Sequence, residues 1–292
     1  MLINEVSKAT GLTKKAIEYY TMQGLVSPTI LENGYRDYSP SDIERLDNIS
    51  ILRQLGLSTN EIKTVLSDES KAALKTISVR KELSYQREQA KKQLLDKLSQ
   101  GHGYSEISQE LQALNNSKTI TEKILEAFPG YFGMFICLHF ARFLNEPIRT
   151  EEQQSAYERI ISFLDNVPPF TLPEDLQEYL TESTKNIGTE QITELIENTR
   201  RSIENPDGFL ADNKEILELY LEYKQSEEYK NSPAYRLMEF TKEFNKTTGY
   251  YDVFIPALKE LSPSYSEYYL QLEEANKKLL ERYPEIEKIN EK

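Results

Sequence analysis

The sequence contains very little cysteine and histidine, with one Cys and two His in 292 residues. The single thiol, Cys137, has no partner for a disulfide within the chain. Cys137, His102 and His139 are together too few for the usual four-ligand zinc site. They also form no convincing Cys and His pair for nucleophilic catalysis. An all-carboxylate site remains open, although no motif indicates one. We therefore expect no metal, no cofactor and no enzymatic activity, in a reducing compartment.

Glycine and valine are also scarce, with 11 Gly and 6 Val against 35 Leu. Leucine keeps its rotamer freedom in a helix, whereas β-branched residues favour strands. No segment alternates convincingly between polar and apolar residues with a period of two. The sequence therefore predicts an all-α fold with a small β wing.

Long apolar runs are missing as well. The longest run, residues 128–144, is interrupted by Pro, Gly, His and Arg, and it is too short for a bilayer span of about 20 residues. Residues 1–11 lack the basic start and the continuous apolar core of a signal peptide. We expect a cytoplasmic protein without a membrane partner.

The charge is distributed unevenly along the chain. The net charge of −13 divides into −3 for residues 1–70, +5 for residues 71–100 and −15 for residues 101–292. The last of these segments also holds 25 of the 30 Tyr and Phe residues. We expect a first domain over residues 1–70, a connecting helix over residues 71–100, and an acidic, aromatic-rich helical domain over residues 101–292.

The first domain contains a helix-turn-helix pattern. Apolar residues at helical spacing end at Gly11, and Thr13 follows as the N-cap of a helix that begins with Lys14 and Lys15. A short helix, a turn that contains Gly and a second helix are typical of a DNA-binding motif, in which the second helix enters the major groove.

Turn and cap signals continue beyond this motif. Asn33-Gly34 predicts a type I′ turn in a small hairpin wing. Ser39-Pro40 has the pattern of an N-cap followed by the first helical residue, and Ser58 with Glu61 forms a capping box for another helix.

The order of these residues resembles the winged helix-turn-helix domain of the MerR family over about residues 1–70. The matching segments are Thr10–Tyr20, Gly24–Pro28, Gly34–Tyr38, Asp42, Leu52–Ser58 and Glu61-Ile62. The resemblance implies a homodimeric transcription regulator that binds a pseudo-palindromic, double-stranded promoter with a long spacer. Such a dimer distorts the spacer when an effector binds, so that RNA polymerase can engage.

Carried over position by position, the resemblance assigns DNA contacts to residues of both the second helix and the wing. Contacts with the major groove and adjacent phosphates are assigned to Thr13, Lys14, Lys15 and Tyr19, and wing contacts to Tyr35, Arg36 and Tyr38. Glu18 and Ile30 depart from the family, which usually has arginine before the Tyr pair and often before the wing. Glu18 either weakens non-specific affinity or turns inward to pair with Lys14 or Lys15; both alternatives are open.

The connecting helix corresponds to the antiparallel dimerisation helix of the family. Its apolar seam opens with Leu74 and Ile77 and closes with Leu94, Leu95 and Leu98, but charged and polar residues interrupt the middle. Such a seam is poor for a parallel coiled coil, whereas an antiparallel pair tolerates it, since each end packs on the other end of its partner.

Amphipathic spacing predicts successive helices in the acidic domain. Separate helices are expected over residues 104–114 and 120–128, followed by a buried helix over residues 131–144. Ser232-Pro233 and Ser262-Pro263 repeat the start signal of Ser39-Pro40.

Abundant aromatic and acidic residues in this domain suggest an effector that is a bulky apolar or cationic small molecule. Candidate ligand-binding residues are Tyr131, Phe132, Phe135, His139, Tyr250, Tyr251 and Phe254. The alternative is that these side chains form a core and that the acidity serves solubility.

The resemblance does not determine the effector. Metal-sensing members use cysteines after the dimerisation helix, and this sequence has none there. The multidrug-sensing type has a β-containing effector domain, unlike this helical one, although multidrug sensing remains an expectation. The other open interpretation is a protein-interaction module that responds to a partner instead of a small molecule.

Overall fold

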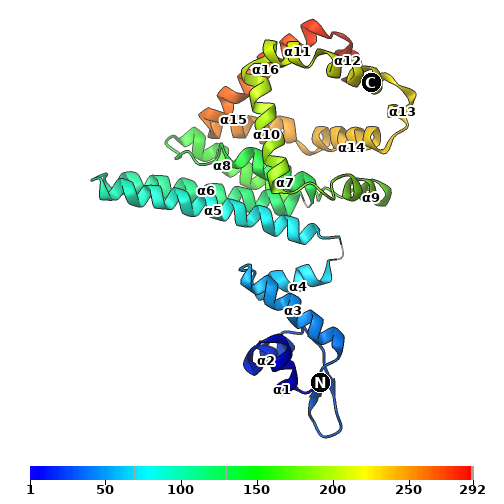
Figure 1. The fold of residues 1–292 in the computed structure, drawn as a ribbon. Helices are drawn as coiled ribbons and strands as arrows, with labels where there is room; N and C mark the ends of the chain where they lie inside the picture. The colour runs from blue at the N-terminus through cyan, green and yellow to red at the C-terminus, as the bar shows by residue number, and fades with distance from the viewer. Residues whose placement is uncertain (69, 129, 291–292) are drawn as a thin grey trace. The chain divides into compact units, whose positions relative to one another are not determined.

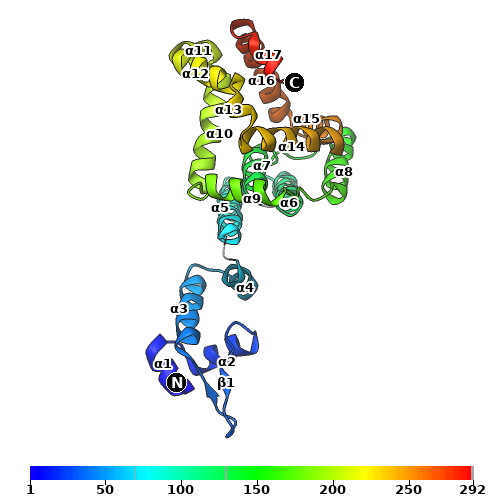
Figure 2. The same cartoon turned by 90° about the vertical axis from the view of Figure 1, so that its right-hand side faces the viewer.

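The computed structural model describes residues 1–68, 70–128 and 130–290. The chain divides into two compact units, Met1–Ile77 and Ser78–Lys292. Figures 1 and 2 show that helices make up almost all of the regular structure, apart from one short hairpin in the first unit. The predicted all-α fold with a small β wing is confirmed.

The first unit consists of short helices around a hairpin. Its elements are α1 (Ile3–Thr10), α2 (Lys14–Met22), β1 (Thr29–Ile30), β2 (Arg36–Asp37), α3 (Pro40–Gln54) and α4 (Thr59–Ser67). A single apolar core joins all four helices and includes the fully buried side chains of Val6, Ile17, Leu25, Leu46, Ile49 and Ile62. The hairpin extends from this core as a narrow wing (Figure 2).

The helix starts in this unit are those expected from the sequence. The Thr13 hydroxyl accepts a hydrogen bond from the Ala16 amide at 3.2 Å, at the start of α2. Ser39 and Ser58 cap α3 and α4 in the same way, and each belongs to a capping box. These caps satisfy backbone N–H groups that have no partner within the helix, so they fix where each helix begins.

The turn of the wing differs from the prediction. Gly34 has a φ of 80°, whereas Asn33 has a negative φ, which a type I′ turn does not allow. The Gly34 amide donates to the Leu31 carbonyl at 2.8 Å, and the Leu31 amide donates to the Tyr35 carbonyl at 2.8 Å. The loop therefore has three residues and ends in a left-handed glycine, and the type I′ prediction is wrong.

Helix α5 (Ala72–Ser99) is the long helix predicted over residues 71–100. Asp68 accepts hydrogen bonds from the Ser70 amide at 2.9 Å and the Ala73 amide at 2.6 Å, which supports its first turn. Further along, Leu94 packs with Ile107 and Leu114 of α6 (Tyr104–Ala127). Helix α6 of the same chain thus covers part of the apolar seam of α5 that was expected to pair with a second copy.

The second unit is entirely helical over the residues that the structure describes. After α6 it contains α7 (Tyr131–Ala141), α8 (Glu151–Asn166), α9 (Glu174–Ser183), α10 (Thr189–Glu204), α11 (Pro206–Asp212), α12 (Lys214–Gln225), α13 (Glu227–Lys230), α14 (Pro233–Thr248), the π-helix η1 (Tyr250–Phe254), α15 (Ile255–Leu261), α16 (Pro263–Arg282) and α17 (Glu285–Asn290). Ser232 and Ser262 cap α14 and α16, as predicted.

Helix α6 corrects the prediction of two separate helices. It continues without a break because a buried stripe at helical spacing, which includes Leu114, Ser117 and Thr121, runs through the polar middle of the segment. The Thr121 hydroxyl donates to the Ser117 carbonyl at 2.9 Å, so this buried polar group is satisfied inside the helix.

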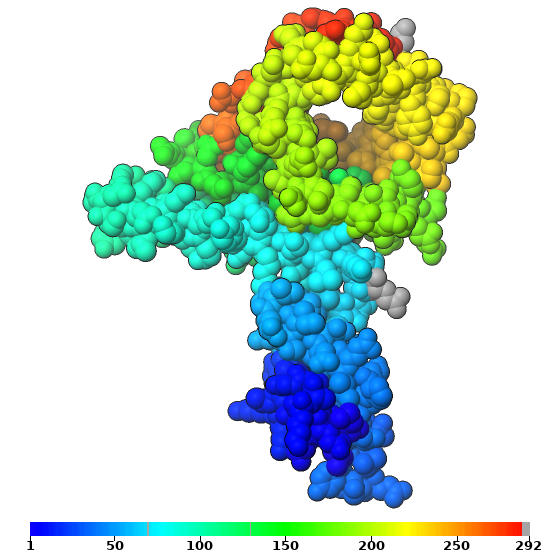
Figure 3. Space-filling model, viewed as in Figure 1, coloured from blue at the N-terminus to red at the C-terminus, as the bar shows by residue number. Residues whose placement is uncertain are grey.

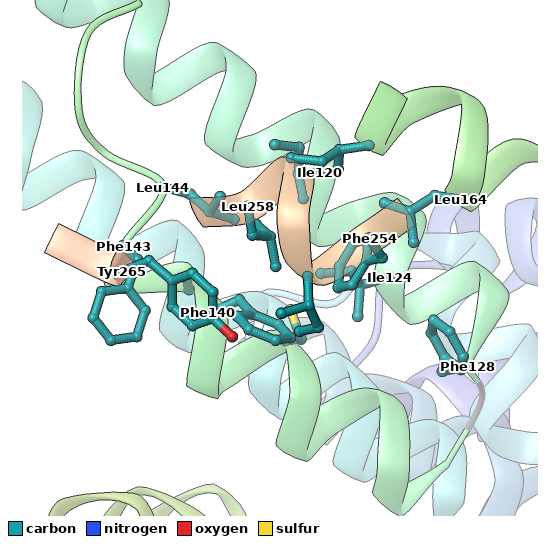
Figure 4. Close-up of a cluster of buried hydrophobic side chains, with 14 of the residues drawn as sticks. Ile120, Ile124, Phe128, Phe140, Phe143, Leu144, Leu164, Phe254, Leu258 and Tyr265 are labelled. Carbon is teal, nitrogen blue, oxygen red and sulfur yellow. The ribbon is translucent and has the colours of Figure 1, made fainter. Parts of the chain in front are cut away.

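The core of the second unit forms where α6, α7, α8, α15 and α16 meet (Figure 4). Phe254 is completely buried there, with its ring centroid 5.5 Å from that of Phe140 and 5.0 Å from that of Phe163. Phe143 and Tyr265 make a similar contact at 5.2 Å. Within the described ranges, no helix is long and apolar enough to cross a membrane.

Candidate nucleic-acid interface and ligand groove

One face of α2 is exposed and carries the residues expected to contact DNA. Thr13, Lys14, Lys15 and Tyr19 are all exposed, whereas Ile17 is fully buried and Tyr20 nearly so. This separation follows from the helical period, because residues three and four apart share a face. The capped start of α2 thus presents a hydroxyl and two ammonium groups together.

The wing adds a second set of exposed groups. Tyr35 and Arg36 are exposed on the hairpin. In contrast, Arg45 donates to the Leu25 carbonyl at 2.5 Å and Arg53 to the Leu57 carbonyl at 2.7 Å, so these guanidinium groups are bound within the unit. Among the described residues, Lys14, Lys15 and Arg36 make no ion pair with a carboxylate. Their charges are available to phosphate groups.

Tyr19 lies between the helix face and α4. Its side chain is 46% exposed, and its hydroxyl lies 3.2 Å from the Thr59 hydroxyl, in the first turn of α4. This contact holds the phenol at the surface in one orientation. Sequence reasoning did not identify Thr59, since forty residues separate it from Tyr19 and no local pattern links them.

Tyr38 occupies a different place from the one expected. Its side chain is 1% exposed, and its hydroxyl lies 3.2 Å from the Thr21 hydroxyl. A side chain in this position is a core residue and does not reach a phosphate. The assignment of Tyr38 to the wing contacts is therefore wrong.

Glu18 is exposed on the same face of α2 as the two lysines. In the part of the chain that the structure describes, it forms no ion pair with Lys14 or Lys15. The alternative in which Glu18 turns inward to pair with one of them is therefore wrong. A carboxylate on this face lowers the positive potential that attracts phosphate groups.

In the second unit, four of the candidate ligand-binding residues form an aromatic row on α7. Tyr131, Phe132, Phe135 and His139 are half-buried, and the His139 ring is nearly parallel to the Phe135 ring at 6.3 Å. Burial and the nearby Arg142 guanidinium lower the pKa of His139 to about 4. The imidazole is therefore neutral at pH 7, which excludes it as a cationic partner for a ligand.

Arg142 is the other polar residue on this apolar segment. Its guanidinium carbon lies 4.5 Å from the Phe143 ring centroid and 5.0 Å from that of Tyr268. Its Nε and Nη2 atoms are buried and have no hydrogen-bond partner among the described residues. The two aromatic faces and the nearby Glu197 carboxylate therefore stabilise this charge.

Phe254 belongs to the core, and the partly buried Tyr250 packs against it. Phe254 is completely buried, and the Tyr250 ring stacks on it with centroids 5.5 Å apart. Burial raises the pKa of the Tyr250 hydroxyl well above its usual range. The assignment of Phe254 to ligand contact is wrong, because its ring is enclosed by Phe140 and Phe163.

Phe132 and Tyr251, in contrast, both line a groove with a volume of about 620 Å³. Helices α9 and α14 form its walls, with the residues Tyr179, Leu180, Ser183, Ala234, Leu237, Met238, Thr241, Lys242 and Asn245. Figure 3 shows one face of this unit, where the chain from α10 to α14 frames a separate opening, which α9 does not border. Sequence reasoning missed the walls, although Ala234, Leu237, Met238 and Thr241 recur at helical spacing.

Comparison with known proteins identifies the first unit. Residues 1–69 match the family model described as MerR HTH family regulatory protein. The HTH-type transcriptional regulator CueR of Yersinia pestis is 41% identical over 68 residues, which cover 23% of this chain and 49% of that protein. HmrR of Rhizobium leguminosarum bv. viciae is 40% identical over 67 residues, which cover 23% of this chain and 52% of that protein.

A third relative is the heavy metal-dependent transcription regulator 2 of Rhizobium meliloti (strain 1021), which is 39% identical over 77 residues, covering 25% of this chain and 52% of that protein. The chain thus spans about half the length of the curated relatives it matches. Within the described residues, no group of three or more His, Cys, Asp or Glu side chains is arranged to hold a metal ion. The matched family consists of DNA-binding regulators and not of enzymes.

Proposed function

We propose that this chain, whose residues 1–69 form a MerR-type helix-turn-helix domain, is a cytoplasmic transcription regulator that binds double-stranded promoter DNA. One observation carries the proposal. The ammonium groups of Lys14 and Lys15 and the guanidinium of Arg36 are exposed and not neutralised by a carboxylate within the described residues. Such cations bind DNA by displacing counterions from its phosphates.

The exposed groups divide into two roles. Thr13, Lys14 and Lys15 at the start of α2 enter the major groove, where the helix reads base edges and its lysines hold adjacent phosphates. Tyr35 and Arg36 of the wing bind the backbone. The hydroxyl of Tyr19, held by Thr59, donates to a phosphate. Glu18 on the same face limits non-specific affinity, so that specific base contacts contribute more of the selectivity.

A homodimer accounts best for this mode of binding. Two copies of the domain read the two halves of a pseudo-palindromic site, and α5 of each copy pairs with that of its partner in the opposite direction. Tyr85 and Leu95 are exposed on α5, at 61% and 65%, and supply apolar surface for this pairing. The dimer distorts the promoter spacer, and RNA polymerase engages the distorted DNA.

Residues 101–292 act as the effector-sensing domain. Of the apolar and cationic small molecules considered from the sequence, the apolar class is better supported, because the 620 Å³ groove is lined mainly by carbon atoms and, among the described residues, by no carboxylate. Pockets for small ligands have volumes of about 300–1,000 Å³.

An alternative is that this domain binds a protein partner. Ile216, Leu219, Tyr220 and Tyr223 lie on one face of α12 and are between 44% and 67% exposed. An apolar helix face of this kind is typical of protein-protein contacts. A partner protein on α12 would replace the small molecule as the regulating signal.

Selection from a random pool of DNA duplexes tests the proposal with the full chain. We expect enrichment of a pseudo-palindromic sequence with a long spacer, and protection of both half-sites in a footprint. A matched variant, Lys15→Glu, is expected to abolish the enrichment, since it places an anion at a phosphate contact. Equal retention of all duplexes by the unaltered chain would contradict sequence-specific binding.

A further inference from the structure

Helix α14 has an apolar face that the chain covers only in part. None of its 16 residues is fully buried, although its sequence is amphipathic. Ala234, Leu237, Met238, Thr241 and Asn245 follow one another at spacings that place them on one side of the helix, and all five line the groove. An amphipathic helix normally buries such a face. Helix α14 therefore retains apolar surface for another molecule.

Helix α9 forms the opposite wall of the groove and is fixed to α14. Leu176 is buried, and the Asp175 carboxylate accepts a hydrogen bond from the Arg236 guanidinium at 2.5 Å. Tyr179, Leu180 and Ser183 follow on the groove side. The two helices thus contact each other through this exposed ion pair and form the walls of the groove.

The π-helix η1 closes the groove with an aromatic side chain. It begins after Gly249, whose φ is 83°, and its residues differ in burial. Tyr251 is 58% exposed and lines the groove, whereas Phe254 is completely buried in the core. Phe132 of α7 adds a second aromatic ring. Ligand contact with Tyr251 therefore acts on a segment that is anchored in the core.

The charges around the groove select the class of ligand. Lys242 supplies the charged group among the lining residues, and the lining includes no carboxylate in the part of the chain that the structure describes. The Lys242 ammonium forms an ion pair with the Glu239 carboxylate at 3.9 Å, so an anionic ligand would compete with that carboxylate for the ammonium. Ser183, Thr241 and Asn245 supply neutral hydrogen-bonding groups. This surface favours an anion over a cation.

We propose that the α9–α14 groove binds an elongated apolar molecule that carries one anionic group. The apolar part lies along Leu180, Leu237 and Met238, and the anionic group is held by Lys242. The proposal deepens the proposed function, on which it rests, since this ligand would be the effector. The acidity of the unit as a whole therefore does not determine the charge of the ligand; the residues at the groove do.

A tryptophan reporter tests the ligand class directly, because the chain contains no tryptophan. In the full-length Tyr179→Trp variant, decanoate is expected to shift the fluorescence to the blue and to saturate. Decyltrimethylammonium, which has the same chain length and the opposite charge, is expected to bind at least tenfold more weakly. The control variant Tyr220→Trp, on α12, is expected to show no saturable shift. Equal or tighter binding of the cation would overturn the proposal.

Two pairs of matched variants locate the site. Ser183→Trp fills the groove, whereas Thr181→Trp places the same ring on another face of α9, away from the lining residues. Calorimetric titration with decanoate is expected to show at least a tenfold loss of affinity for the first and less than a twofold change for the second. The same contrast is expected between Lys242→Glu and Lys246→Glu. Equal effects within both pairs would overturn the assignment of the groove.

The two proposals fail in different ways. Decanoate binding is measured without DNA, and promoter binding is measured without decanoate. A chain that binds promoter DNA but shows no saturable binding of decanoate overturns the groove proposal alone. A chain that binds decanoate but no DNA overturns the proposed regulator and leaves the ligand class standing.

Discussion

The hydroxyl of Tyr38 lies 3.2 Å from the hydroxyl of Thr21, and the two groups join the wing to α2 inside the first unit. Arg36 is exposed, whereas Tyr38 is buried. Residues two apart in a strand share a face, but β2 ends at Asp37, so this rule does not extend to Tyr38. The contact ties together the two elements that are proposed to bind DNA. Tyr38 thus supports the interface without belonging to it.

Substitutions at Tyr38 are expected to change stability. Tyr38→Phe removes one partly buried hydrogen bond and is expected to lower the free energy of unfolding by about 1 kcal/mol. Tyr38→Ala also leaves a cavity and is expected to cost about 3–5 kcal/mol. Thermal unfolding of the full chain measures both. The control Tyr35→Ala, at an exposed position, is expected to keep the stability and weaken DNA binding. If Tyr38→Ala instead weakened DNA binding without lowering the stability, Tyr38 would be a DNA contact.

Lys15→Ala and Arg36→Ala are expected to change how DNA binding depends on salt. Each removes one phosphate contact, so the slope of log K against log salt concentration is expected to fall by about 0.9 per substitution. Fluorescence anisotropy with a labelled duplex at several salt concentrations measures the slope. Lys15→Arg keeps the charge and is expected to preserve it. Unchanged slopes in both alanine variants would remove these residues from the interface.

Glu18→Arg is expected to strengthen DNA binding. The substitution replaces an exposed anion on α2 by a cation that phosphate attracts, so the affinity for non-specific duplexes rises and the salt slope steepens by about 0.9. Glu18→Gln, which only removes the anion, is expected to give a smaller gain. Anisotropy with a duplex of unrelated sequence checks both variants, and a weaker complex for Glu18→Arg would show that this position lies away from the phosphates.

Local signals in the sequence sufficed to predict the helix starts. Thr13, Ser39 and Ser58 bond to backbone amides three residues later, so the cap and its partner lie in the same short segment. The wing turn was less predictable, because Asn33-Gly34 is compatible with two kinds of loop. Gly34 suits both loops, because the second central position of a type I′ turn and the last position of the three-residue loop each have a positive φ.

Contacts between distant segments were not accessible to such reasoning. Tyr35 and Tyr38 have the same chemistry and neighbouring positions, yet Thr21 and the core determine which of them is buried. The groove depends on α9 and α14, which lie about fifty residues apart in sequence and are joined by Asp175 and Arg236. The aromatic excess in residues 101–292 did not distinguish Tyr251 at the groove from Phe254 in the core.

His139 is expected to make the second unit less stable in acid. Its pKa in the folded chain is about 4, below the value of about 6.5 for an unfolded imidazole. The unfolded chain therefore binds the proton first, and stability falls as the pH decreases from about 6.5 to about 4, by about 3 kcal/mol at most. Unfolding measured across this range tests the effect. His139→Phe, which does not titrate, is expected to flatten the dependence; an unaltered profile would assign the loss to other groups.

Gly133→Ala is expected to disrupt the junction between α6 and α7. A Cβ atom at this position would lie 1.5 Å from the carbonyl oxygen of Phe128, a backbone atom that cannot rotate away. The start of α7 must then shift from the core that it shares with α6. Such overpacking costs about 1–3 kcal/mol or more, and we expect the upper part of this range because the clash is with backbone.

Gly103→Ala provides the matched control for this substitution. Gly103 is the N-cap of α6, its φ is −74°, and a Cβ there meets no atom of the described residues within 4 Å. Its replacement is expected to change the free energy of unfolding by less than about 1 kcal/mol. Thermal unfolding of the full chain compares the two variants. If Gly133→Ala is no less stable than Gly103→Ala, the close approach of α7 to Phe128 does not constrain the fold, and the second unit tolerates a wider separation of these helices.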